Sequence, residues 1–280
     1  MTSRPNPGRE RAAAWRDRAA PHARAVIGRL ARAVVDFALP RHCLGCGGAV
    51  ERGRADVCCA ACWAALPGLG DPRCSRCGHP LVVRDLPPPH DPGPRRCRWC
   101  DLLPPYMRAG RSVCWAPEGL GGTVVHALKY DGWTVAAGAM ARRMAALDWP
   151  DDVVRERAAL VPVPLAAARK RERGYNQSQV LAAALADVLA PDARLPVWDD
   201  VLVRTRSTRS QTRLTPAERL TNVAGAFRAA PAAAGRLRGA HLVLVDDVVT
   251  TAATLNACAA ALVAGGARVV SFVTFGRARA

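Results

Sequence analysis

The apolar residues of this chain recur in two spacings, one typical of buried strands and one typical of helices. Short apolar runs predict strands at 111–115, 159–163, 242–245 and 269–275. Apolar residues at helical spacing predict helices at 23–39, 120–129, 135–147, 179–189 and 255–262. The run at 242–245 is continuous and bounded by turn residues, which predicts a strand covered on both faces in the middle of a parallel sheet.

The strand predicted at 242–245 leads directly into the clearest chemistry of the chain. It runs into two carboxylates, Asp246 and Asp247, and then into a turn that opens a helix and comprises Thr250, Thr251, Ala252, Ala253 and Thr254. In open α/β sheets, ligands bind at the carboxyl ends of the strands. The N–H groups at the start of a helix bind phosphate. This stretch therefore predicts a site for a phosphorylated ligand beside two carboxylates.

Two nucleotide-binding classes are excluded because their motifs are missing from the sequence. A strand ending in acidic residues also occurs in P-loop ATPases, but the chain has no G-x-x-x-x-G-K-[ST]. A dinucleotide fold needs G-x-G-x-x-G after a strand, and the nearest stretch, at 119–122, does not complete it. What remains resembles the phosphoribosyl diphosphate (PRPP) signature of type I phosphoribosyltransferases, in which a hydrophobic strand, two acidic residues and a threonine-rich turn follow one another.

The net charge of the chain is compatible with a nucleic-acid partner and with other anionic ligands. The 280 residues, 50% of them hydrophobic, allow one sizeable core and a small extra module. The net charge of +17 favours binding to phosphate backbones. However, all of the 40 basic residues except Lys129 and Lys170 are arginine, a bias equally typical of skewed genomic base composition or of polyphosphorylated ligands. With no apolar run of about 18 residues and no signal-peptide core, we expect a cytoplasmic protein without a membrane span.

Eight of the eleven cysteines form four C-x-x-C pairs. In a cytoplasmic protein this spacing indicates metal rather than disulfides. Because two such pairs complete the closed tetrahedral shell of a structural zinc ion, the eight cysteines predict two zinc sites. The predicted ligands are Cys43, Cys46, Cys59, Cys62, Cys74, Cys77, Cys97 and Cys100. Gly47 and Gly78, each directly after the second cysteine of a pair, suit the tight turn of a zinc knuckle.

The pairing of these cysteines stays open at this point. Gaps of twelve residues between the first two pairs and nineteen between the last two suit sequential ribbons, whereas a cross-braced arrangement would interleave the pairs. Cys58 is an alternative to Cys59, and three histidines lie close enough to substitute for a ligand: His42, His79 and His90. We favour the sequential cysteines, and we expect this segment not to fold without metal, because metal binding supplies its folding energy.

Several polar stretches are compatible with more than one role. The run at 169–178 carries four cations in five residues and predicts either a solvated face, an RNA-binding patch or a loop over an anionic ligand. Lys129 lies near the end of a predicted helix, where it balances the helix dipole or serves as a diphosphate ligand. Residues 204–213 lack apolar periodicity and predict a mobile surface loop. A capping box that begins at Thr215 predicts a helix running to about 222.

The chain divides into three predicted parts. Residues 1–40 comprise a mobile Arg- and Ala-rich tail and the amphipathic helix, which packs on its own domain or touches a membrane surface. Residues 41–104 comprise the double zinc ribbon, with a stiff proline-rich excursion at 85–96. Residues 105–280 comprise the ligand-binding domain.

Taken in order, these motifs resemble the ComF family, bacterial phosphoribosyltransferase-like proteins linked to natural competence. The resemblance covers residues 40 to 278 and includes L-K-Y at 128–130, V-P-V-P at 161–164, R-x-R-G-Y-N-Q-S at 171–178, R-S-Q-T at 209–212 and E-R-x-x-N-V at 218–223. It implies an α/β fold of the type I phosphoribosyltransferase kind, a parallel sheet with helices on both faces, preceded by a Cys-rich double zinc ribbon.

The resemblance also implies roles for individual residues. Asp246 and Asp247 would hold the ribose hydroxyls of PRPP directly or through Mg²⁺, and 250–254 would cradle its 5′-phosphate. Four residues would face the diphosphate with Lys129: Val163, Pro164, Arg171 and Arg173. Arg209 would act in catalysis from a loop at 209–213 that closes over the site and excludes water. Single-stranded DNA and a competence helicase are the further partners implied.

One position departs from the family pattern. Ala252 stands where T-T-G-x-T usually has glycine, so if this position needs a positive φ, its Cβ costs about 1 kcal/mol and weakens PRPP binding. No residue identifies the acceptor. The sequence therefore supports two hypotheses, a phosphoribosyltransferase and a non-catalytic DNA-uptake component that binds single-stranded DNA or a helicase. A zinc-stabilised scaffold without a ligand is the remaining option.

Overall fold

The computed structural model describes residues 42–50, 56–81, 97–116, 118–190, 195–206, 223 and 225–279. Several predictions lie outside the described residues: the tail and helix at 1–40, His90 in the proline-rich stretch at 85–96, Arg209 with the loop at 209–213, and the helix at 215–222. Within the part that is described, no helix is both long and apolar enough to cross a bilayer.

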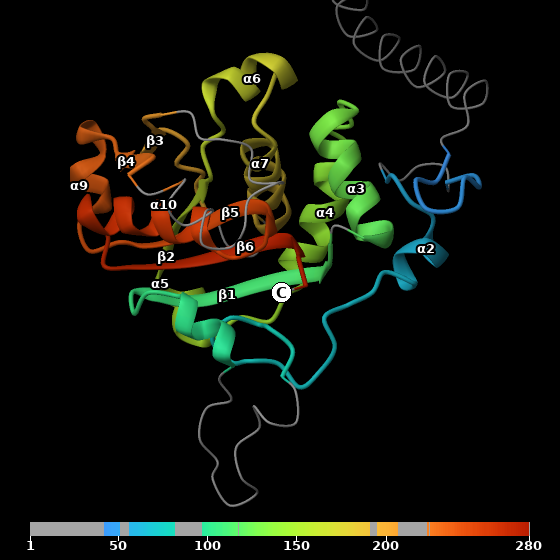
Figure 1. The fold of residues 1–280 in the computed structure, drawn as a ribbon, viewed down its shortest axis with the longest axis horizontal. Coiled ribbons are helices and arrows are strands. Elements are labelled where there is room, and N and C mark those ends of the chain that lie inside the picture. The colour runs from blue at the N-terminus through green and yellow to red at the C-terminus, as the bar shows by residue number, and fades with distance from the viewer. Residues whose placement is uncertain are drawn as a thin grey trace, which may run out of the picture.

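The centre of the fold is a four-stranded sheet in which every strand pair is parallel (Figure 1). Its order is β1 (Met107–Trp115), β6 (Val269–Arg277), β5 (His241–Val249) and β2 (Arg157–Pro162). The strand predicted at 242–245 is thus an inner strand, as expected. It is longer than predicted because its pairing with β6 continues past the acidic pair to Val249, which places both carboxylates at the end of the strand rather than in the following turn.

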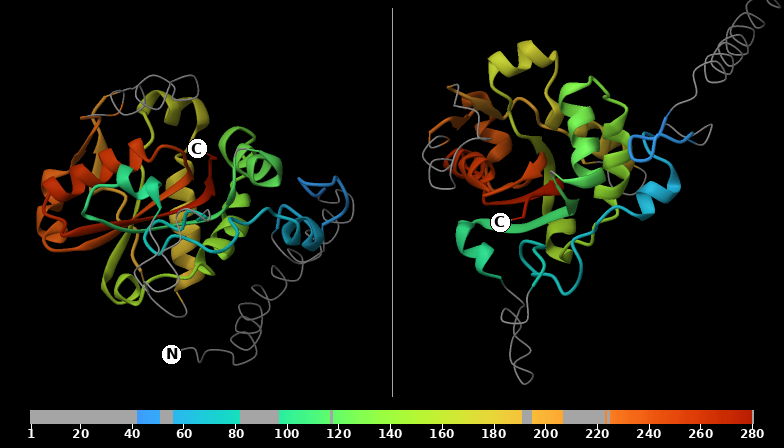
Figure 2. Two further views of the ribbon diagram at one scale, coloured as in Figure 1. Left: turned by 60° about the horizontal axis from the view of Figure 1, so that its bottom comes forward. Right: turned by 45° about the vertical axis from the view of Figure 1, so that its right-hand side comes forward.

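Successive side chains of β5 enter two different cores. Leu242 and Leu244 pack in one core with α10 (Ala253–Ala264) and α9 (Ala234–Leu237). Val243 and Val245 pack in the other core with α3, α4 and α7, which span Gly119–Tyr130, Ala136–Ala145 and Gln177–Leu189. Helices therefore cover both faces of the sheet, as Figures 1 and 2 show, and the predicted fold class is confirmed.

Two predictions about polar stretches are corrected in part. At 169–178 the loop alternative is wrong, because Ala167–Arg173 form α6, which ends at Gly174 with φ of 84°. This helix has no buried residue, which agrees with the alternative of a solvated face. Arg204 is not in a loop, because it ends β3 (Leu202–Arg204), which pairs with the antiparallel strand β4 (Phe227–Ala229). Helix α5 (Asp151–Glu156) and the 3-10 helix η4 (Pro231–Ala233) were not predicted, since they are too short to show a period.

The two cysteine-rich segments join different cores. The first carries α2 (Ala60–Ala64) and contributes Trp63 to the core of α3, α4 and α7. The second carries the 3-10 helix η2 (Arg98–Leu102) and contributes Trp99 to the core of α10. In Figures 1 and 2 the first segment lies beside α3 and α4, whereas the second lies along the edge strand β1.

Candidate functional site

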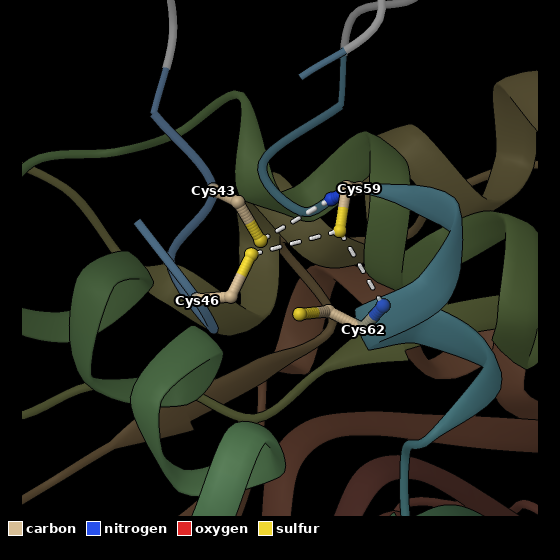
Figure 3. Close-up of side chains that lie close together, drawn as sticks. All are labelled: Cys43, Cys46, Cys59 and Cys62. Carbon is tan, nitrogen blue, oxygen red and sulfur yellow. Dashed lines mark hydrogen bonds between the residues drawn. The ribbon is translucent and has the colours of Figure 1, made fainter. Parts of the chain in front are cut away.

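The eight predicted ligands come together in two sequential groups. The first group is Cys43, Cys46, Cys59 and Cys62, and the second is Cys74, Cys77, Cys97 and Cys100. Within each group all sulfur atoms lie within 4.8 Å of one another, and in the first group they point toward a common centre (Figure 3). The sequential pairing is therefore the observed one, and the cross-braced alternative does not occur.

The geometry of both groups fits zinc. A tetrahedral ion with Zn–S distances of about 2.3 Å requires sulfur atoms about 3.8 Å apart. The separations are 3.9 Å between Cys46 and Cys59, and 3.4 Å both from Cys74 to Cys100 and from Cys77 to Cys97. Structural zinc is therefore the cofactor that these thiols support.

Each group begins with the same knuckle. The N–H of Gly47 donates to Cys43 O at 2.9 Å, and that of Gly78 donates to Cys74 O at the same distance. Both glycines have positive φ, 72° and 67°, as the sequence predicts for a chain that turns back on itself. Outside the knuckles, Cys58 is not part of the group, and burial followed by the nearby Cys43 raises its pKa to about 12, which disfavours the thiolate. Neither His42 nor His79 is a member of either group.

The acidic pair is held by side chains from two helices. Lys129 of α3 forms an ion pair with Oδ2 of Asp247, and Gln177 Nε2 of α7 donates to Oδ1 of the same carboxylate at 3.3 Å. Ser178 Oγ donates to Asp246 Oδ1 at 2.8 Å. Asp247 is buried, whereas Asp246 keeps part of its surface exposed. The carboxyl end of β5 is therefore a preformed polar centre with one accessible carboxylate.

The pKa values of the two carboxylates are shifted in opposite directions. Burial and then the negative charge of Asp247 raise the pKa of Asp246 to about 8. Burial acts on Asp247 too, but the ammonium of Lys129 outweighs it and holds the pKa of Asp247 below its ordinary value. Asp247 therefore ionises before Asp246, and an approaching cation favours the ionisation of Asp246.

The turn after β5 has the conformation that the sequence left as a question. Ala252 has φ of 58°, in the left-handed region, and it is the N-cap residue of α10. Its methyl group is buried in the core of α10. Among the described residues, the buried Oγ1 of Thr251 has no hydrogen-bond partner. A left-handed residue and an unpartnered hydroxyl at a helix start make a turn suited to an anion.

Other predicted residues lie nearby with contacts that the sequence did not indicate. The N–H of Val163 donates to Val245 O at 3.0 Å, and its carbonyl accepts from Asn176 Nδ2 at 3.0 Å, so both backbone groups of Val163 are engaged. Pro164 follows it, half-buried. Arg173 Nη1 donates to Gln177 Oε1 at 2.5 Å, and this connects it through Gln177 to the acidic pair. Arg171 is exposed on α6.

Sequence reasoning missed Gln177 and Ser178 as members of the site. Asn176 caps α7, because its side chain accepts from the N–H of Ser178 at 3.1 Å, and the helix therefore begins two residues before the apolar pattern. A cluster of polar residues at the first turn of a helix that follows a strand is the signal that could have revealed them.

A parallel-sheet phosphoribosyltransferase fold that carries two four-cysteine ribbons is the class that this fold and site define. Family models agree: the double zinc ribbon domain matches residues 34–101 and the phosphoribosyl transferase domain matches residues 175–280.

Individual relatives give the family. The chain is 33% identical over 208 residues to the DNA utilization protein YhgH of Salmonella typhimurium strain LT2, and 32% identical over 209 residues to that of Escherichia coli K12, in each case over 70% of this chain and 80% of the relative. Competence protein F of Haemophilus influenzae is 35% identical over 98 residues, which is 35% of this chain and 41% of the relative. The chain belongs to the family of these proteins, the ComF family.

A solved glutamine PRPP amidotransferase from B. subtilis is a more distant likeness. It has 19% identity and a TM-score of 0.35, over 60% of this chain and 32% of that chain. This is too weak a likeness to bear on the function of this protein.

Proposed function

We propose that this protein binds PRPP with Mg²⁺ at the carboxyl end of β5 and transfers the phosphoribosyl group to an acceptor. The observation that carries this proposal is the convergence of an acidic pair and an anion-suited turn at one strand end. Asp246 and Asp247 adjoin the turn that contains Thr251 and the left-handed Ala252. Hydroxyl groups of a ribose and a phosphate on its C5 need such acceptors and donors side by side.

The residues of the turn take the 5′-phosphate in this proposal. The first N–H groups of α10 have no acceptor within their own helix, and the helix dipole adds positive potential there. Thr250, Thr251 and Thr254 supply hydroxyl donors, of which Thr251 Oγ1 is buried without a partner among the described residues. The site is therefore able to replace the water around a phosphate with fixed donors.

Cations around the acidic pair take the diphosphate. Lys129 and Arg173 lie at the pair, directly and through Gln177, while Arg171 and Arg209 are candidates from α6 and from outside the described residues. Mg²⁺, held by Asp246 and Asp247, would neutralise charge on the diphosphate. Breaking the bond at C1 moves electrons onto the leaving group, so a fixed cationic shell lowers the barrier.

Calorimetric titration of Mg·PRPP into the zinc-loaded protein tests this proposal. We expect heat of binding in the wild type and a loss of at least tenfold in affinity in the double variant Asp246→Asn with Asp247→Asn. Asp187→Asn is a matched control, since it removes an exposed carboxylate of α7 away from the strand end. Absence of heat in the wild type, or equal heat in the double variant, would sink the proposal.

A second function, binding of single-stranded DNA, is supported by a different surface. Tyr130, Trp133 and Val135 are exposed by 58%, 40% and 41%, and the last two line a groove of about 280 Å³. The guanidinium of Arg173 lies 5.1 Å from the centre of the Tyr130 ring. Arg173 is the last residue of the basic helix α6. Exposed rings beside cations bind bases and phosphates of a single strand. The names of the relatives add a link to DNA utilization and competence.

Fluorescence anisotropy with a labelled oligonucleotide tests this second function. We expect affinity that falls steeply with salt, and a loss of about tenfold in Trp133→Ala, since one stacked base is worth about 1–3 kcal/mol. An abasic strand should not distinguish Trp133→Ala from the wild type. Val154→Ala is a control, because Val154 is 47% exposed on α5. Absent or salt-independent binding rejects this function, and failure of both assays leaves a zinc-stabilised scaffold.

A further inference from the structure

The second cysteine group is built into the core beneath the proposed phosphate turn. All four of its cysteines are at most 5% exposed. Trp99 and Leu103, which flank it, pack in the same core as Ala252, Ala253 and Leu255. This ribbon is therefore in contact with the start of α10 through a continuous apolar core.

Two arginines fix the backbone of this ribbon against the sheet. Arg277 of β6 is 1% exposed, donates to Cys77 O at 2.7 Å and lies 4.4 Å from the centre of the Trp99 ring. Arg76 crosses from the ribbon and donates to four carbonyl oxygens, those of Met107 at 3.0 Å, Cys100 at 3.3 Å, Leu103 at 3.5 Å and Pro104 at 2.6 Å. Because these bonds end on backbone oxygens, they hold the position of η2 and not only of its side chains.

One side chain connects η2 to the first turn of α10. Asn256 Nδ2 donates to Leu102 O at 2.7 Å, and the backbone N–H of the same residue donates to Ala252 O at 2.8 Å. The second bond is the first hydrogen bond of the helix and closes its turn on the left-handed residue. The end of η2 and the proposed phosphate turn are thus joined through a single residue.

The first cysteine group connects to a different helix. It contains the exposed Cys46, and it packs on the opposite core, where the guanidinium of Arg143 lies 3.4 Å from the centre of the Trp63 ring. Asp56 of this ribbon accepts from Arg142 of α4 at 2.8 Å. Metal bound in this group would therefore stabilise α4.

We infer that Asn256 is a positioning residue that couples the second cysteine group to the first turn of α10, so that metal in this group and an anion at 250–254 stabilise each other. The identity of the anion rests on the proposed function, whereas the coupling does not. Because coupling free energies are reciprocal, metal should tighten anion binding and the anion should tighten metal binding by the same factor.

Hydrogen exchange of the zinc-loaded protein without any ligand tests the coupling directly. Asn256→Ala removes the donor without adding charge, whereas Asn256→Asp keeps the shape of the side chain and replaces its donor with a negative charge. In both variants we expect amides 256–258 to exchange about fivefold to tenfold faster, the effect of one lost hydrogen bond. Gln179→Ala is the matched control. It removes a side-chain amide in the first turn of α7, which donates to Asp199 Oδ2 in a hydrogen bond of 2.5 Å.

Zinc release to a chromogenic chelator supplies the second readout. We expect the exposed group to lose metal first, and saturating Mg·PRPP to slow the second phase in the wild type more than in Asn256→Ala. If exchange at 256–258 is the same in the wild type and both Asn256 variants, the inference is overturned whether or not PRPP binds. If exchange responds but the wild type gives no heat with Mg·PRPP, the coupling stands and the proposed function falls.

Discussion

The substitution Ala252→Gly tests how the turn after β5 is built. Among the described residues, Ala252 is the only non-glycine residue with a positive φ, 58°, and it is 4% exposed. Glycine would relieve the strain of a Cβ in the left-handed region, which is about 1 kcal/mol. If strain were the only effect, the variant would be more stable than the wild type.

Two effects of similar size oppose that gain. The buried methyl group of Ala252 contributes about 0.8 kcal/mol, and glycine stabilises the unfolded chain by about 0.4–1 kcal/mol of conformational entropy. The sum is a net loss of about 0.5 kcal/mol in the free energy of unfolding. Because the methyl packs in the core of α10, we expect the affinity for Mg·PRPP to stay within about threefold of the wild type, a change below 1 kcal/mol.

Urea unfolding of the zinc-loaded protein measures the first quantity and calorimetry the second. Ala252→Val is the informative companion, since a β-branched residue is disfavoured at positive φ and overpacks the core, for a loss of about 2 kcal/mol or more. A gain above about 1 kcal/mol in Ala252→Gly would mean that strain exceeds packing. Affinity about tenfold tighter would mean that the methyl obstructs the ligand. Either result refutes the reasoning.

Three further predictions concern charged side chains. The affinity for Mg²⁺ should rise from pH 7 to pH 9, because Asp246, whose pKa is raised to about 8, must lose its proton. Titrations of Mg²⁺ should show this rise in the wild type and no rise in Asp246→Asn. A flat pH profile in the wild type contradicts the prediction. Lys129→Met should lower the free energy of unfolding by up to about 3 kcal/mol in urea, because it leaves the buried carboxylate of Asp247 without its cation; an unchanged midpoint contradicts it. Arg277→Met should cost about 1–3 kcal/mol, since Cys77 O loses a buried donor, and zinc content measured alongside shows whether the second group still loads.

The sequence predicts those features whose signal is contiguous. The apolar run of β5, the acidic pair and the C-x-x-C knuckles each occupy neighbouring positions, so their local geometry follows from short-range rules. Both knuckle glycines have the positive φ that their position after a second cysteine predicts. Similarly, the alternation of β5 between two cores follows from an apolar run that has no polar face.

What the sequence does not predict depends on contacts between distant residues. Gln177 and Asp247 are 70 positions apart, and Arg277 and Cys77 are 200 apart, so no local pattern indicates either bond. The reason why α6 was not predicted as a helix is different. Its cations have helical propensity as good as that of leucine, but α6 buries nothing, and a helix without an apolar face shows no period in the sequence.

The two ribbons pack against opposite faces of the inner strand β6. Trp63 of the first ribbon meets Phe275 of β6 with ring centres 6.4 Å apart, and Trp99 of the second meets Phe272 of the same strand at the same distance. These two phenylalanines lie on opposite faces of β6, so the ribbons hold one inner strand from both sides. The first thereby completes the core that carries the helix of Lys129, and the second completes the core beneath Ala252. Because metal binding supplies the folding energy of such ribbons, metal at the two sites would stabilise the two halves of the proposed ligand site.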